Sequence, residues 1–261
     1  MRMLAGLSPA NSGAITVSGI DVVKDNRAVR EVMGVVTQHD GLDGGLTVFQ
    51  NLFLHGFLAG LSRKDSKNRA HAVLEFFGLR DKSKANVYKL SGGMKRRLAI
   101  AWSMMTSPSV IVMDEPSTGL DPQSRNRVWE ELAVLKDVGV TVLLSTHYME
   151  EATILCDRLS IMDNGKILDE GTPDQMIERH APKEVAQLRV SPVSIRTVRG
   201  YLTEQNIMFR EVGALISVTG VNGDRPDLSG LNDLEGVRTS YRAGNLEDVF
   251  IAITGRELRD G

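Results

Sequence analysis

Two adjacent carboxylates follow a run of apolar residues in the middle of the chain. Val110–Met113 is continuously apolar, and Asp114 and Glu115 come directly after it. Such runs are typical of parallel strands buried on both faces, and ligands bind at the carboxyl edge of those sheets. There, Asp114 can hold magnesium through water, and Glu115 can orient or deprotonate an attacking water. Alone, the pair could equally cap a turn before Pro116, but the full string Val110–Asp121 favours a hydrolytic phosphate site.

A serine and two glycines lie upstream, at the expected start of another helix. Ser91 is a good N-cap, and Gly92 and Gly93 beside it let a ligand approach the backbone closely. The exposed N–H groups and the helix dipole favour a bound anion. By themselves these residues fit an ordinary capped helix followed by a solvated basic turn, Lys95–Arg97. Their place before Asp114, on a separate helix, favours a phosphate-binding role.

Two more polar residues follow predicted strands. His147 comes after the apolar run Val140–Leu144, which places it at the same sheet edge as Glu115, where it can contact a phosphate or the attacking water. Gln38 ends the predicted strand Val32–Thr37 and could coordinate magnesium or sense a partner. Either residue alone would be read as an ordinary polar loop residue.

The elements around these residues predict a parallel α/β sheet. A helix is expected over Pro122–Asp137, with Asp121 as its N-cap, Pro122 at its first position and Gly139 after its end. It lies between the strands Val110–Met113 and Val140–Leu144. Strand, helix and strand with short joints form a βαβ unit, so the sheet is expected to be parallel and covered by helices.

Further elements are predicted on either side of this unit. Before the unit we expect the tail of a helix over Met1–Leu7, a strand over Ala14–Val17, a helix capped by Thr47, and helices over Ser66–Phe77 and from Ser91 through Met105. After the unit we expect a hairpin of Leu159–Met162 and Lys166–Leu168 around Asn164-Gly165, and a helix over Gln175–His180. The last part is predicted to have strands over Val185–Val190, Met208–Val212, Leu215–Thr219 and Arg238–Tyr241, a helix over Ser194–Gln205, and a final helix capped by Asn245. Ala181-Pro182 is read as a boundary, after which a small α+β module follows.

Composition excludes several classes of function. The formal net charge of −2 argues against a dedicated nucleic-acid or polybasic membrane binder. One cysteine, Cys156, excludes an internal disulfide framework and fits a reducing compartment. The most apolar stretch, Leu46–Leu61, contains Gln50, Asn51 and His55 and is shorter than the roughly 20 residues that span a bilayer. We therefore expect a soluble, cytoplasmic protein, unless a partner holds it at a membrane.

Taken in order, these motifs resemble those of the ATP-binding subunits of ABC transporters over residues 1 to about 175. The matching segments are Leu90–Met94 for the signature motif, Val110–Glu115 for the Walker B motif, Ser117–Asp121 for the D-loop, His147 for the switch histidine and Gln38 for the Q-loop glutamine. Asn245–Phe250 and Thr254–Leu258 resemble the C-terminal module of drug-exporter and nodulation-type lipo-oligosaccharide-exporter ATPases.

The resemblance implies a P-loop NTPase-like cassette over residues 1–180, with a helical subdomain at about 46–106, and an accessory α+β module over 181–261. It implies ATP and magnesium as ligands, with Asp114 and Gln38 serving the metal. It implies that Glu115 activates water and that His147 stabilises the transferring phosphate.

The resemblance also implies partners. Two subunits would pair head to tail around two ATP molecules, with Ser91, Gly92 and Gly93 of one copy contacting the γ-phosphate held by the other. Asp121 would link the two sites, besides capping its helix. The region Gln38–Leu61 would contact a membrane-spanning permease of an exporter, at the inner face of the cell membrane. No nucleic-acid partner is implied.

One part of the family pattern is not found. A phosphate loop has the form Gly-x4-Gly-Lys-Ser/Thr, whereas the only Gly-Lys pair here is Gly165-Lys166, which Ile167 follows. In the family, a helix resembling Met1–Leu7 follows that loop. We therefore expect an N-terminally truncated cassette that lacks its first strand, binds ATP weakly and does not hydrolyse it alone.

Three alternatives stay open at this point. The chain could be a fragment or degenerate subunit that keeps only an interaction role. It could be a non-transport ABC ATPase acting on ribosomes, although those usually carry two cassettes in one chain. It could be a chromosome-maintenance ATPase, which would need a coiled-coil insertion that the sequence lacks. The sequence does not specify a cargo.

Overall fold

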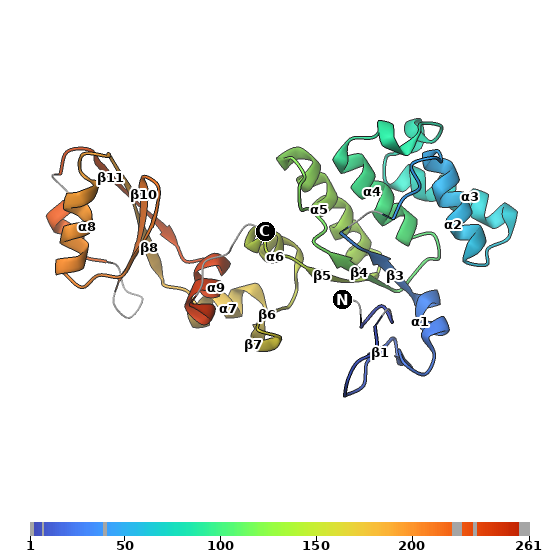
Figure 1. The fold of residues 1–261 in the computed structure, drawn as a ribbon, viewed down its shortest axis with the longest axis horizontal. Coiled ribbons are helices and arrows are strands. Elements are labelled where there is room, and N and C mark those ends of the chain that lie inside the picture. Colours follow the sequence, from blue (N-terminus) through green and yellow to red (C-terminus); the bar gives the residue numbers. More distant parts are fainter. Residues whose placement is uncertain (1–2, 7, 39–40, 221–225, 232–233, 256–261) are drawn as a thin grey trace. The chain divides into compact units, whose positions relative to one another are not determined.

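The computed structural model describes residues 3–6, 8–38, 41–220, 226–231 and 234–255 of the chain (Figure 1). The chain divides into two compact units, Met1–His147 and Tyr148–Gly261, which are described separately below. No helix in the described ranges is both long and apolar enough to cross a bilayer.

A three-stranded parallel sheet forms the centre of the first unit. Its order is β3 (Met33–Val36), β4 (Val110–Asp114) and β5 (Thr141–Ser145). In register, Met33 pairs with Val110 and Val110 with Thr141. The predicted parallel α/β fold is therefore confirmed. The carboxyl ends of all three strands meet at one edge, as the βαβ pattern requires.

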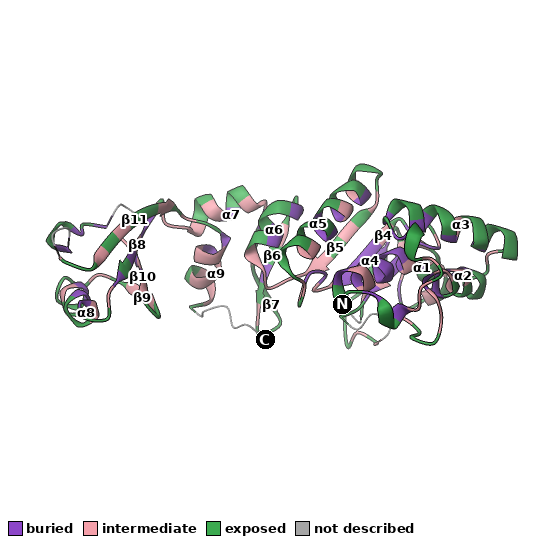
Figure 2. Cartoon of the chain, turned by 90° about the horizontal axis from the view of Figure 1, so that it is seen from above, coloured by how far each residue is buried: buried purple, intermediate pink, exposed green. Residues whose placement is uncertain are grey.

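Two helices pack beside this sheet. Helix α4 (Gly92–Ser103) contacts β3 and α5 (Pro122–Asp137), and α5 also contacts β5. The predicted helix after Asp121 is confirmed at both ends. It starts where the Asp121 carboxylate accepts the Ser124 N–H at 3.0 Å. In Figure 2, α4 and β4 carry a large share of buried residues.

Helices α2 (Val48–Leu58) and α3 (Arg63–Phe76) and the short 3-10 helices η1 (Arg80–Lys82) and η2 (Val87–Lys89) lie between β3 and α4 in the chain. Thr47 caps α2 in a reciprocal box with Gln50, as predicted. Helix α3 begins three residues earlier than predicted, because the Ser62 hydroxyl accepts the Asp65 N–H at 3.1 Å and caps it there.

The start of the chain differs from the prediction. Met3–Gly6 form a turn, closed by a bond from the Gly6 N–H to the Met3 carbonyl at 3.1 Å, and not the tail of a helix. Gly6 is left-handed, with φ +65°, and its carbonyl accepts the Asn26 side-chain amide at 3.0 Å, which fixes the turn. Residues 1, 2 and 7 of that prediction lie outside the described residues.

The strand after this turn is also shorter than predicted. Only Thr16–Val17 (β1) of the expected strand Ala14–Val17 is paired, antiparallel with β2 (Ile20–Asp21). Helix α1 (Asn26–Val32) was not predicted and is capped by Asp25.

The second unit begins with α6 (Met149–Leu155) and a hairpin of β6 (Leu159–Asp163) and β7 (Lys166–Gly171), followed by α7 (Pro173–His180). The hairpin is confirmed, since Asn164 and Gly165 turn the chain with φ of +48° and +75°. The final helix, α9 (Leu246–Thr254), packs on α6 and α7.

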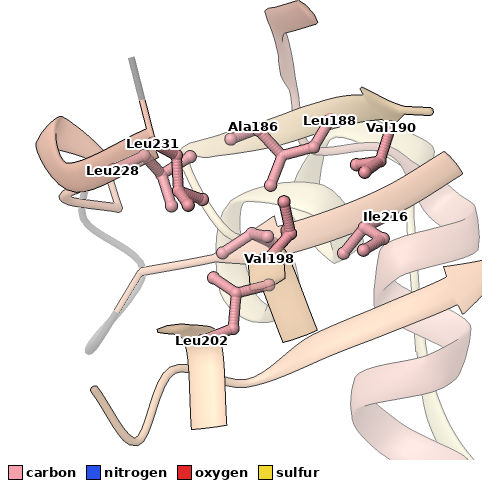
Figure 3. Close-up of a cluster of buried hydrophobic side chains, with 9 residues drawn as sticks. Ala186, Leu188, Val190, Val198, Leu202, Ile216, Leu228 and Leu231 are labelled. Atoms are coloured by element: carbon pink, nitrogen blue, oxygen red, sulfur yellow. The ribbon is translucent and has the colours of Figure 1, made fainter. Parts of the chain in front are cut away.

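A four-stranded antiparallel sheet follows, in the order β11 (Val237–Ala243), β8 (Glu184–Val190), β10 (Leu215–Thr219) and β9 (Phe209–Val212). Helix α8 (Ile195–Glu204) and the 3-10 turn η4 (Ser229–Leu231) cover one face, and their apolar side chains close the core in Figure 3. The predicted strands and helix of this part are confirmed within a residue or two. The domain division at residue 180 stays a prediction. Helix α9 packs on α6 and α7, which precede that residue.

Candidate functional site

Asp114 and Ser145 occupy the last positions of two paired strands. Asp114 ends β4, Ser145 ends β5, and the two residues are register partners. The Ser145 hydroxyl donates a hydrogen bond to the Asp114 Oδ1 atom, which fixes the direction of the carboxylate. Sequence reasoning placed Asp114 at this edge but did not single out Ser145. A hydroxyl at the end of the neighbouring strand was the only available signal.

Glu115 and His147 are brought together at the same edge. The Glu115 Oε1 atom lies 3.1 Å from the His147 Nδ1 atom, and the Thr118 hydroxyl donates to Oε2 at 3.0 Å. Both side chains are partly exposed, at 31% for Glu115 and 25% for His147. Each carboxylate oxygen therefore has a defined partner, while solvent still reaches the pair. A carboxylate held in this way can accept a proton from a bound water.

Gln38 lies two residues past the end of β3, and its side chain is exposed. Val36, the last residue of β3, pairs with Met113 directly before Asp114. Gln38 therefore belongs to the same sheet edge as Asp114 and Glu115. We describe these four residues, Gln38, Asp114, Glu115 and His147, as the edge group.

The oxygen atoms of the edge group suit magnesium. Magnesium prefers oxygen ligands, keeps several waters, and is usually held by one or two carboxylates together with substrate phosphates. Asp114 and Gln38 offer such oxygens, and among the described residues no set of three or more His, Cys, Asp or Glu is placed to form an all-protein cage. The residues therefore fit a metal that arrives with a phosphate substrate.

Ser91, Gly92 and Gly93 form the start of α4. The Ser91 hydroxyl accepts the Met94 N–H at 3.3 Å, so the predicted cap is present. A Cβ on Gly93 would lie 2.4 Å from the Ser124 Oγ atom, whereas one on Gly92 would be 3.9 Å from its nearest neighbour in Leu120. Gly93 is thus required for the close approach of α4 to α5, a structural reason that the sequence did not reveal.

Asp121 lies beside these residues at the start of α5. Its carboxylate accepts both the Ser124 hydroxyl, at 2.7 Å, and the Ser124 N–H. These hydrogen bonds lower the pKa of Asp121. We describe Ser91, Gly92, Gly93 and Asp121 as the cap group, which is brought together by the α4–α5 contact.

Arg96 was missed by sequence reasoning and contacts the edge group directly. The side chain is buried, at 6% exposure, and donates to the carbonyls of Thr37, Asp114, Glu115 and Pro116. The interpretation of Lys95–Arg97 as a solvated basic turn is therefore wrong for its two arginines. The available signal was spacing, since Arg96 and Arg97 follow Gly92 and Gly93 by one helical turn and share their faces.

Arg97 points to a different part of the first unit. Its guanidinium donates to the Phe77 carbonyl at 3.0 Å and lies 3.6 Å from the Glu131 Oε1 atom on α5. Burial raises the pKa of Glu131 to about 7. Arg97 therefore ties α4 to the end of α3 and to α5 and not to the edge group.

Comparison with known proteins finds similarity along the whole chain. Residues 1–118 match the sequence model of the family described as ABC transporter. A Nod factor export ATP-binding protein I from Cupriavidus pinatubonensis is 39% identical over 260 residues, which cover 100% of this chain and 79% of that protein. The protein of the same name from Burkholderia lata is 38% identical over 261 residues, covering 100% and 84%.

Solved structures show the same fold. A structure titled as the ATP binding subunit of an ABC transporter is 28% identical, with a TM-score of 0.60, over 68% of this chain and 74% of that chain. A dimeric ATP-binding cassette in a post-hydrolysis state, bound to ADP and Pi, has a TM-score of 0.58 over 66% and 78%, and at 23% identity it supports the fold alone.

Proposed function

Because this chain belongs to the ATP-binding subunits of ABC transporters, we propose that its edge group takes part in hydrolysing ATP to power an exporter. The observation that carries the proposal is the contact of 3.1 Å between Glu115 and His147, beside Asp114 at the carboxyl edge of a parallel sheet. The names of the relatives, which are Nod factor export ATP-binding proteins, support export as the direction of transport.

The roles of the edge group follow from its contacts. Glu115 is the proposed general base, because its Oε1 and Oε2 atoms are held by His147 and Thr118 while the side chain remains partly exposed. His147 orients that carboxylate and faces the same edge. Asp114, held by Ser145, and Gln38 are the proposed magnesium ligands. Bound magnesium would neutralise charge on the phosphates of ATP.

We propose that the cap group serves a second copy of the chain. Ser91, Gly92 and Gly93 present the start of a twelve-residue helix, where N–H groups and the helix dipole favour an anion. Asp121 caps α5 through Ser124, whose side chain lies against Gly93 at this helix start, and we propose that Asp121 links the two sites across the interface between copies. In this arrangement two copies pair head to tail around two ATP molecules.

The proposal for residues 1–261 does not include a phosphate loop that would bind the phosphates of ATP. The sequence contains Gly-Lys only at Gly165-Lys166, where Gly165 lies in the β6–β7 hairpin turn and Lys166 begins β7. Hydrogen bonds to charged groups contribute about 1.5–3 kcal/mol each, so ATP binding without a phosphate loop is expected to be weak. For residues 1–261 taken alone, an interaction-only role is the second candidate.

A membrane partner is proposed for the exposed side of α2. Leu54, Phe57 and Leu58 are 41%, 41% and 74% exposed. The rings of Phe49, Phe53 and Phe57 follow one another with centroids 6.0 and 6.3 Å apart. Apolar side chains gathered in this way are typical of interaction surfaces. We propose that the region Gln38–Leu61 contacts a membrane-spanning permease, which would hold the protein at the inner face of the cell membrane.

The proposed base is tested by Glu115→Gln in a chain extended at its N-terminus by a phosphate loop, in the complex with the permease, with phosphate release as the readout. General bases contribute on the order of 10²–10⁴-fold, so a loss of about 10²-fold or more is expected. ATP-dependent pairing of the subunits, measured by light scattering, should persist. Glu130→Gln on the exposed side of α5 is the matched control and should leave the rate unchanged.

Two other outcomes would change the proposal. Undiminished phosphate release in the Glu115→Gln variant would remove Glu115 as the base. If the unaltered complex releases no phosphate while permease binding persists, the interaction-only role becomes the leading function.

A further inference from the structure

A single buried guanidinium spans the ends of two strands in the first unit. From the middle of α4, the Arg96 Nη1 atom donates to the Thr37 carbonyl at 2.7 Å and the Nε atom to the Pro116 carbonyl at 2.8 Å. Its Nη2 atom donates to the carbonyls of Asp114, at 2.8 Å, and Glu115, at 3.1 Å. Three consecutive carbonyls, starting at the last residue of β4, and one carbonyl after β3 therefore share one side chain.

These carbonyls lie where the backbone most needs support. Glu115 has φ +45°, a left-handed conformation that is uncommon outside glycine and persists only where the surrounding structure holds it. Its N–H donates to the Ser145 carbonyl at 3.0 Å, and its own carbonyl accepts from Arg96. Both sides of the residue are thus held, and the conformation persists because its surroundings determine it.

The fixed backbone determines where the Glu115 side chain points. With the carbonyls of Asp114, Glu115 and Pro116 anchored, the carboxylate is directed to His147 and Thr118. The fourth carbonyl belongs to Thr37, which immediately precedes Gln38. The same guanidinium therefore also fixes the backbone at the start of the loop that contains Gln38, here called the Gln38 loop, relative to Glu115.

We propose that Arg96 is a positioning residue that holds Glu115 and the start of the Gln38 loop in one arrangement relative to the signature helix α4. It acts through backbone carbonyls and touches no reacting atom. The proposal rests on the function proposed above for Glu115. A guanidinium is suited to the task because it carries five N–H donors in a planar fork, whereas an ammonium has three donors and no fixed fork.

The test uses the position of the His147 imidazole as its readout. The chain has five histidines, so ring-¹⁵N labelling gives a small set of imidazole signals, with those of His147 assigned from their loss in His147→Gln. Spectra of the unaltered protein and of Glu115→Gln, at one fixed pH, define the signals with and without the Glu115 contact. In Arg96→Gln we expect the His147 signals to move at least halfway toward their Glu115→Gln positions.

Arg97→Gln is the matched control. Arg97 is the next residue on the same helix, is equally buried at 9% exposure, and also donates to a carbonyl, but that of Phe77. It should leave the His147 signals in place even if it lowers the thermal stability. The signals of His55 and His71, which lie on α2 and α3, should not move in Arg96→Gln, because a general loss of structure would move them as well.

Arg96→Lys keeps the charge and covers the case in which Arg96→Gln does not fold. It should move the His147 signals in the same direction by a smaller amount. The proposal is overturned if the His147 signals stay in place in the folded Arg96 variants, or if Arg97→Gln moves them as far. It is also overturned if Glu115→Gln leaves them unmoved. Since no hydrolysis is measured, failure of Glu115 as the base would show in phosphate release and not here.

Discussion

Glu115 shows how one residue can depend on contacts from four other residues. Its backbone is left-handed, its N–H and carbonyl are held by Ser145 and Arg96, and its carboxylate is held by His147 and Thr118. A general base needs a defined position more than a strong hydrogen bond, because proton transfer depends on geometry first. The position of Glu115 therefore depends on its partners as well as on its own side chain.

From the lowered pKa of His55 we predict that the first unit loses stability in acid. Its ring stacks on Trp102 with centroids 3.5 Å apart, and burial lowers its pKa to about 4 from 6.5. The unfolded chain then binds a proton more strongly than the native chain between these values. Unfolding free energy should therefore fall as pH drops from 6.5 to 4, by up to about 3 kcal/mol.

The His55 prediction is checked by chemical denaturation of His55→Phe across that pH range. Phenylalanine keeps a ring against Trp102 but cannot be protonated. The fall in unfolding free energy between pH 6.5 and 4 should be smaller in the variant than in the unaltered protein. Equal slopes would show that His55 is not buried as described.

From the raised pKa of Glu131 we predict the opposite dependence of the unfolding free energy on pH. Burial raises its pKa to about 7, against an ordinary value of 4.5. The native chain then holds a proton more strongly than the unfolded chain. This contribution to stability is full below pH 4.5 and is lost as pH rises through about 7, with a magnitude of up to about 3 kcal/mol.

The Glu131 prediction is checked by comparing slopes and not absolute stabilities, since Glu131→Gln also changes the contact with Arg97. Between pH 5 and 8, unfolding free energy should decline less in Glu131→Gln than in the unaltered protein. A parallel decline in the two proteins would contradict the raised pKa.

At the scale of elements, the contact between α4 and α5 decides where the cap group lies. Gly93→Ala should lower the unfolding free energy by about 1–3 kcal/mol, because a Cβ would lie 2.4 Å from Ser124 Oγ and 2.6 Å from Ser124 Cβ. Gly92→Ala is the control, with 3.9 Å to the nearest atom, and should be nearly neutral or slightly stabilising. Urea denaturation of both variants checks this, and equal losses would contradict the close approach.

Local signals decided the elements that the sequence predicts best. Asp121 and Pro122 start α5, the Asn164-Gly165 pair turns the hairpin, and Thr47 caps α2, each within a few residues of the chain. The turn at Met3–Gly6 could not be predicted in the same way. Its glycine carbonyl is held by Asn26, twenty residues further along the chain.

At the scale of the whole molecule, the last helix ties the second unit together. Leu246 and Val249 on α9 are buried against Ala152, Ile161 and Met176, which belong to α6, β6 and α7. The segment after the predicted boundary at residue 180 therefore contributes to a core that lies before it. Arg242 on β11 adds an ion pair with Asp248 on α9, in which Nη1 and Nη2 donate to the two carboxylate oxygens at 2.6 and 2.9 Å.

Leu246→Ala should loosen this core by about 2–5 kcal/mol, because Leu246 is 1% exposed. Hydrogen exchange then gives the readout, with faster exchange expected at the amides of α7. Ile154→Ala, on a side chain that is 57% exposed, is the control and should leave exchange unchanged. Unaltered protection of α7 in Leu246→Ala would show that α9 does not stabilise it.

From the sequence alone, the ordered motifs pointed to the family by resemblance. The caps, turns and apolar runs predicted the α/β fold, because each acts over a few residues. The sequence also placed Gln38, Asp114, Glu115 and His147 at one sheet edge, since parallel strands all end there. Their proposed chemical roles stay predictions.

The residues that surround the site are set by tertiary contacts. Arg96, Ser145 and the packing role of Gly93 depend on contacts across 18 to 59 residues of chain, and nothing in their local sequence specifies a partner. The physical reason is that a buried donor or a missing Cβ is defined by what packs against it. Such neighbours exist only once the strands and helices have come together.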